Sequence, residues 1–264
     1  MRLVDFTGER GDDVDYAAFR SHYERFWSSP DRSNVEMEPS ALRSRLASLR
    51  SHLVDAERAF ERLGLSTSGL GAVAFLGHGT SNGHACLLSG RFVAWYALEQ
   101  YTTPHDFAAF VPHELAHAVH YALVPDFSFT SIEEQRCTGR QLVTEGLATR
   151  IAQRAGALSP EAALWGGYLE AGPAQAWTSR CRSRLRELVR FILDHWAESL
   201  PGNPLFTYNP AEDILKNTGG YYVGMAATAH LEDVEKLSLA ELIAMPRLDA
   251  EQAYQRALLA MFAH

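Results

Sequence analysis

The sequence is poor in cysteine and has no excess of basic residues. Its 264 residues include three cysteines, Cys86, Cys137 and Cys181. An odd number of widely spaced cysteines is typical of reduced thiols rather than of a disulfide framework, so we expect a cytoplasmic protein. The net charge of −8 argues against a nucleic-acid-binding protein, because such proteins usually have a basic surface.

Segments directed at a membrane are also missing from the sequence. The first 15 residues contain no apolar stretch typical of a secretory signal. The longest apolar run, residues 92–98, is much shorter than the roughly 20 residues that cross a bilayer. A hydrophobic content of 47% and a charged content of 21% are ordinary for a soluble globular protein. We therefore expect neither a nucleic-acid partner nor a membrane partner.

Helical patterns occupy both ends of the chain, and strand patterns lie between them. Apolar residues at steps of three and four predict helices over residues 13–27 and 39–63. We expect residues 1–66 to form an N-terminal helical segment that packs on the core. Residues 67–264 are then the main domain, whose part after residue 159 is predicted to be helical.

Strands are predicted in one short region. Apolar runs bounded by glycine or polar turns predict strands over residues 71–77, 85–89 and 91–99. The expected fold class is therefore α+β, mostly α, with a small mixed sheet. An extended peptide can bind by adding a strand to a sheet edge, and either 85–89 or 91–99 could be that edge.

The most distinctive motif follows these strands. Residues 110–121 hold His113, Glu114 and His117 in the order His-Glu-x-x-His. Residues four apart lie on one face of a helix, so both imidazoles can bind the same ion. Glu114 leaves the helix at a different angle and can contact a water molecule on that ion. Two nitrogen ligands, an adjacent carboxylate and an open position suit a zinc peptidase.

The start of the motif helix is marked by two signals. Asp106 is a candidate N-cap residue. Pro112 has no amide hydrogen and disfavours a helical residue before it, so the helix either begins near Pro112 or is kinked there. Both versions leave His113 and His117 on one face.

A catalytic zinc site needs a third protein ligand from another part of the fold. Residues 140–153 form a second predicted helix, and Glu145 in its middle is an acid beside apolar positions. If this helix is antiparallel to the motif helix, Glu145 can supply the ligand, and Gly146 would let the two helices approach closely. Glu133 and Glu134 are rival candidates, although they lie in a polar connection where solvent-exposed acids are expected.

His-Glu-Leu-Ala-His followed by Thr-Glu-Gly-Leu-Ala resembles the gluzincin clan of zinc metallopeptidases. The resemblance implies a zincin-like fold and a Zn²⁺ cofactor held by His113, His117 and Glu145. The metzincin pattern does not fit, because His120 and Leu123 occupy the positions where it requires a glycine and a histidine. The stretch from the first predicted strand through the motif also resembles bacterial families of predicted zinc-dependent proteases.

A tyrosine near residue 220 extends the resemblance. Gly-Gly-Tyr-Tyr-Val-Gly at residues 219–224 resembles the Tyr-x-x-Gly helix start of the gluzincin aminopeptidases. In that group the tyrosine hydroxyl hydrogen-bonds the oxyanion of the tetrahedral intermediate. The resemblance assigns this role to Tyr221, with Tyr222 as the alternative. The Gly-x-Met-Glu-Asn segment that binds the free amine of aminopeptidase substrates is absent, which argues against aminopeptidase activity.

These motifs together predict a zinc metallopeptidase that acts on a peptide or protein substrate. Glu114 is the expected general base and Tyr221 the expected oxyanion donor. Two alternatives stay open: a non-catalytic binding or regulatory protein with a zincin fold, and a zinc hydrolase that acts on a non-peptide amide or ester. Arginines within residues 180–190 are candidates for binding a substrate carboxylate.

Overall fold

Helices predominate in the computed structural model, which describes residues 1–8, 13–27, 35–210 and 212–263. The strands of this part of the chain are β1 (Arg2–Phe6), β2 (Gly71–Phe75), β3 (Gly83–Leu88) and β4 (Arg91–Ala97). The helices before residue 125 are α1 (Val14–Trp27), α2 (Pro39–Arg62), η1 (Leu98–Gln100) and α3 (Pro104–Leu123). Those that follow are η2 (Pro125–Phe127), α4 (Ile132–Gln135), α5 (Thr138–Gly156), α6 (Pro160–Trp165), α7 (Ala171–Ser183), α8 (Leu185–Asp194), η3 (Ile214–Lys216), α9 (Gly219–Asp233), α10 (Leu239–Ile243) and α11 (Arg247–Ala263).

The expected α+β class with a small mixed sheet is confirmed. The four strands are ordered β1-β2-β4-β3, with β1, β2 and β4 parallel and β3 antiparallel to β4. Ser89 and Gly90 both have positive φ angles and join β3 to β4 in a two-residue hairpin turn. Of the two candidate edge strands, β3 is therefore the edge, and β4 lies inside the sheet.

The expectation that residues 1–66 are helical is wrong for residues 2–6, which form β1. Two helices, α1 and α2, do occupy the predicted positions. β1 has five residues and pairs in parallel with β2, from Arg2 beside Gly71 to Phe6 beside Phe75. Its partner lies more than 60 residues later in the chain, so a local sequence pattern carries little information about this pairing.

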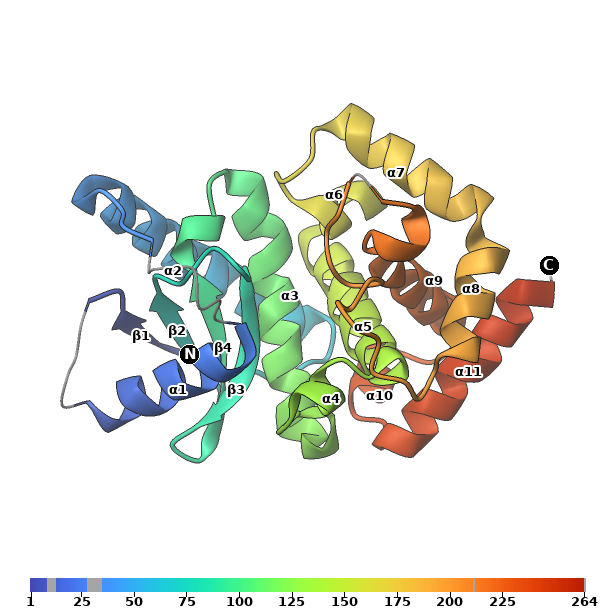
Figure 1. Cartoon of the computed structure of the whole chain (residues 1–264). Coiled ribbons are helices and arrows are strands. Elements are labelled where there is room, and N and C mark those ends of the chain that lie inside the picture. Colours follow the sequence, from blue (N-terminus) through green and yellow to red (C-terminus); the bar gives the residue numbers. More distant parts are fainter. Residues whose placement is uncertain (9–12, 28–34, 211, 264) are drawn as a thin grey trace.

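The two faces of the sheet are buried against different helices (Figure 1). Alternate residues of a strand point to opposite faces, so each face collects every second side chain. One face packs in a core with apolar residues of α2 and α3, and the other packs with Phe19 and Tyr23 of α1. The first face includes Ala72, Ala74, Ala94 and Tyr96, and the second includes Val73, Phe75, Val93 and Trp95.

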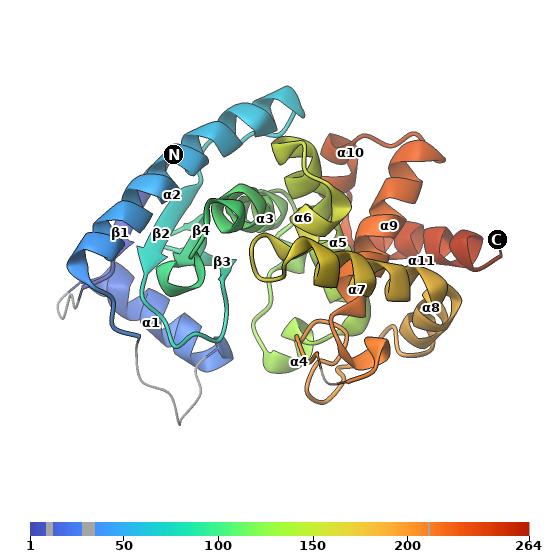
Figure 2. The same cartoon turned by 90° about the horizontal axis from the view of Figure 1, so that it is seen from above.

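Helix α3 lies between the sheet and the C-terminal helices in both views (Figure 1 and Figure 2). Thr103, not Asp106, is its N-cap residue; the Thr103 hydroxyl accepts a hydrogen bond from the Asp106 amide, and the Asp106 carboxylate accepts one from the Thr103 amide. The helix continues through Pro112, so it does not begin there. No described helix is both long enough and apolar enough to span a membrane.

Candidate metal centre

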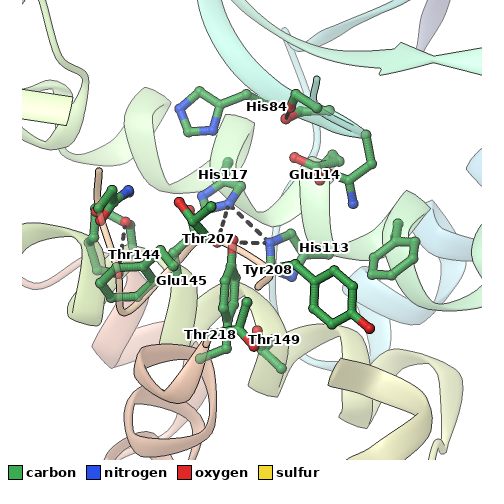
Figure 3. A pocket seen from close by; sticks show the side chains of 18 of the residues that line it. His84, His113, Glu114, His117, Thr144, Glu145, Thr149, Thr207, Tyr208 and Thr218 are labelled. Atoms are coloured by element: carbon green, nitrogen blue, oxygen red, sulfur yellow. Dashed lines mark hydrogen bonds and ion pairs between the residues drawn. The ribbon is translucent and has the colours of Figure 1, made fainter. Parts of the chain in front are cut away.

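Two helices bring three potential metal ligands together. His113 and His117 are buried on one face of α3, and their Nε2 atoms lie 3.2 Å apart. Glu145 is buried on α5, with its Oε2 atom 3.1 Å from His113 Nε2 and 3.4 Å from His117 Nε2. Figure 3 shows the three side chains pointing toward one another. Two nitrogen atoms and one carboxylate oxygen therefore converge on one point.

The separations between these three atoms fit a tetrahedral zinc site. Ligand atoms at about 2.0–2.1 Å from zinc in a tetrahedron lie roughly 3.3–3.4 Å from one another. The separations of 3.1, 3.2 and 3.4 Å are close to that value. Glu133 and Glu134 lie outside this group; Glu134 instead accepts hydrogen bonds from Thr130.

Electrostatics keep the third candidate ligand in the form that binds a cation. Burial alone would raise the pKa of Glu145. His117 and His113 act in the opposite direction through their charges and hydrogen bonds, and the net effect holds the Glu145 pKa well below its ordinary value. Glu145 is thus a carboxylate at neutral pH, with two imidazoles beside it.

Glu114 lies beside the three ligands but outside their group. Its side chain is buried and lines the same pocket. Burial raises the pKa of Glu114 to about 8, an effect that His113 partly opposes and Glu145 reinforces. Gly83, the first residue of β3, lies directly against it, because a Cβ atom there would be 2.5 Å from Glu114 Cγ. The edge strand β3 therefore begins directly beside Glu114, the candidate general base.

The tyrosine at the start of α9 is held near the ligands by a close helix crossing. A Cβ atom on Gly146 of α5 would lie 2.4 Å from the backbone of Gly224, so only glycine fits at this contact. The close approach of Gly146 is thus to α9, and the prediction that it serves contact with the motif helix is wrong. Tyr221, one turn before Gly224, lines the pocket with its ring centroid 6.4 Å from that of His113.

The two tyrosines of this turn have different surroundings. Burial, together with the charges of Glu145 and Glu114, raises the pKa of Tyr221 well above its ordinary value. The phenol is therefore protonated at neutral pH and can donate a hydrogen bond. Tyr222 is not among the described residues that line the pocket; its ring packs against Trp177 at 6.2 Å.

His84 of β3 also belongs to the centre, although the ligand set predicted from the sequence does not contain it. Its Nε2 atom is 3.1 Å from the Tyr121 hydroxyl, and its ring centroid is 4.9 Å from that of His117. Burial and the neighbouring His117 lower the pKa of His84 well below its ordinary value. The proximity comes from the packing of β3 on α3, which no spacing in the sequence signals.

These side chains line a pocket of about 810 Å³ between the sheet and the C-terminal helices. Among the described lining residues none comes from 180–190, so the arginines expected to bind a substrate carboxylate lie elsewhere. Arg136 and Arg140 line it instead, and Arg140 donates hydrogen bonds to the carbonyl groups of Phe127 and Ser128.

Comparisons of this chain with protein-family models, with curated proteins and with solved structures each found no match. The interpretation of the site therefore depends on its own residues and geometry.

Proposed function

We propose that the protein is a zinc-dependent metallopeptidase of the gluzincin type, with a zincin-like fold. One observation carries the proposal: the ligand atoms of His113, His117 and Glu145 converge at separations suited to tetrahedral zinc, with Glu114 beside them. Zinc bound there would polarise a carbonyl group and lower the pKa of water toward about 7. The other steps belong to residues of this chain.

Glu114 is the proposed general base. A carboxylate next to a bound divalent cation has a lower pKa than the same group without one, so metal binding opposes the effect of burial and favours the ionised form. Ionised Glu114 can take a proton from the attacking water and pass it to the leaving amine. A zinc site that only stabilises the fold does not need a carboxylate base beside its ligands. The presence of Glu114 therefore argues against a purely structural zinc site.

Tyr221 is the proposed donor to the oxyanion. Its raised pKa keeps the proton on the phenol, and it lines the pocket beside His113, in the cavity where a substrate carbonyl would bind. A neutral donor of this kind stabilises the negative charge that develops on the carbonyl oxygen.

The edge strand β3 supports a peptide as the substrate. An extended peptide that pairs with the free edge of β3 would pass Gly83 and therefore Glu114. A non-peptide amide or ester would not use this edge. A cleavage screen with a peptide library on the zinc-loaded protein separates the two substrate classes.

The Glu114→Gln variant tests the mechanism. We expect it to bind one zinc ion per chain, measured by elemental analysis, and to lose roughly 1,000-fold in peptide hydrolysis. Glu133→Gln, a change of an exposed acid outside the site, should retain full activity. A fully active Glu114→Gln variant would show that the mechanism is wrong.

We also propose a cytoplasmic location, which the thiols support. Cys86, Cys137 and Cys181 are all free, and Cys86 and Cys181 are buried. A reducing compartment keeps such thiols unpaired. Recovery of the protein in a secreted fraction after cell fractionation would contradict this location.

A further inference from the structure

Aromatic rings line the pocket in two separate groups. The sheet-side group comprises Phe26, Trp27 and Phe129. The helix-side group comprises Phe110, Trp165, Tyr168, Phe206 and Tyr208. Figure 3 shows His84 on the sheet side of the two histidine ligands and Thr218, next to the start of α9, on the opposite side.

The sheet-side group reaches one metal ligand through His84. The ring centroids of Trp27 and Phe129 lie 5.2 and 5.0 Å from that of His84. His84 in turn lies 4.9 Å from His117. Phe26 extends this surface away from the centre, with its ring 4.9 Å from that of Phe129. One wall of aromatic rings thus begins at His117.

The helix-side group reaches the other histidine ligand through Tyr221. Phe206 packs on Tyr221 with a centroid separation of 5.4 Å, and Tyr221 lies 6.4 Å from His113. Two further ring pairs complete the wall. They are Phe110 with Tyr168 at 4.8 Å and Trp165 with Tyr208 at 5.4 Å.

Two of the helix-side rings are open to solvent although they line the pocket. Tyr168 is 42% exposed and Tyr208 is 50% exposed. Tyr168 packs at a tilt on Phe110 and Tyr208 meets Trp165 edge to face, and the exposed part of each ring is available to a ligand. Exposed aromatic surface inside a concave site is typical of a place where an apolar group binds.

We propose that the two aromatic groups are side-chain subsites that select an extended peptide with a large aromatic or aliphatic side chain on each side of the cleaved bond. The inference rests on the proposed peptidase function and names its substrate class. Successive side chains of an extended chain point in opposite directions, so the two residues that share one peptide bond face the two groups. The chain can continue beyond both, which is endopeptidase action.

Internally quenched peptides that differ at one position test this selectivity on the zinc-loaded protein. A reference peptide carries phenylalanine on both sides of the central bond, and its variants carry alanine or aspartate on one side. We expect alanine to lower kcat/KM about 10-fold on either side, with a larger loss for aspartate. Equal kcat/KM for the peptides would overturn the proposal.

Two protein variants test which aromatic group binds the substrate side chain on each side of the cleaved bond. Tyr208→Ala should lower kcat/KM about 10-fold for the reference peptide, and the loss should vanish for the peptide that has alanine on that same side. Phe26→Ala should have the same effect for the other side. Phe262→Ala, which removes an exposed ring outside the pocket, is the matched control and should change nothing. Losses that do not depend on the peptide would contradict the assignment.

Tyr208 is half exposed, so its variant should fold, and Phe26→Leu replaces Phe26→Ala if thermal unfolding shows a loss of structure. Peptide binding to the Glu114→Gln variant, measured by fluorescence anisotropy, separates this inference from the proposed function. Preferential binding of the phenylalanine peptide without hydrolysis by the unmodified protein would sustain the subsites and contradict the peptidase. Hydrolysis without side-chain preference would contradict the subsites and sustain the peptidase.

Discussion

Helix α3 and the pair formed by α5 and α9 contribute to the same site in different ways. On α3 the residues His113, Glu114 and His117 are placed by helical spacing alone. On α5 and α9 the residues Glu145 and Tyr221 come from segments far apart in the chain. The position of Glu145 depends on how α5 packs on α3, and that of Tyr221 depends on how closely α9 crosses α5. One half of the candidate site is therefore local in origin, and the other half depends on packing.

Among the tests of this comparison, the largest expected effect concerns Glu145, the ligand that α5 contributes. Glu145→Gln should weaken zinc binding by at least about 100-fold. Loss of a residue that only hydrogen-bonds a metal ligand already costs up to that factor in affinity, and Glu145 is itself a proposed ligand. Competition with a chromophoric chelator measures the affinity. Glu133→Gln is the control and should bind zinc like the unmodified protein. If Glu133→Gln weakened binding more than Glu145→Gln, the packed half of the site would be assigned to the wrong residue.

The next effect separates the two tyrosines of α9. Tyr221→Phe should lower kcat for peptide hydrolysis about 100-fold, since loss of one oxyanion donor costs that much, and should leave zinc affinity unchanged. Tyr222→Phe should stay within about 2-fold of the unmodified protein, because its ring packs on Trp177. Steady-state kinetics measure both. Equal losses would contradict the assignment of the donor to Tyr221.

The crossing of α5 and α9 can be tested directly at its closest point. Gly146→Ala should lower the free energy of unfolding by about 2–3 kcal/mol, because the new Cβ atom overlaps the backbone of Gly224. Urea denaturation measures the change. Gly172→Ala is the matched control: a Cβ atom there meets no atom within 4 Å, so stability should stay equal or rise slightly. An unchanged free energy of unfolding for Gly146→Ala would show that α5 and α9 can move apart at this contact without loss of stability.

The smallest effect concerns the local half of the site. Thr103→Ala removes the N-cap of α3 and should cost about 1 kcal/mol of stability. Thr103→Ser keeps the hydroxyl and should cost much less. Zinc affinity should be unchanged in both variants, because helical spacing alone sets the distance between His113 and His117. A fall in zinc affinity for Thr103→Ala would mean that the geometry of α3 also depends on its surroundings.

Prediction from the sequence succeeded where the signal is short-range. The periodicity of residues 13–27 and 39–63 corresponds to α1 and α2, and the apolar runs near residues 71, 85 and 91 correspond to β2, β3 and β4. It failed at β1, because a five-residue strand owes its existence to pairing with a distant partner. The start of α3 was predicted only in part. Asp106 lies in the first turn, but Thr103 is the N-cap because the two residues form a capping box, and of the two versions left open at Pro112 a helix start there is wrong.

The sequence by itself determined the ligand spacing on α3, because helical geometry places residues four apart on one face whatever surrounds the helix. Only the tertiary structure decided the remaining contributions. It made β3 the sheet edge, placed Gly83 against Glu114, brought His84 to His117, packed α5 on α3 so that Glu145 lies within 3.4 Å of both histidines, and crossed α5 closely with α9, which carries Tyr221. Each of these depends on contacts between segments that are distant in the chain, which no local pattern encodes.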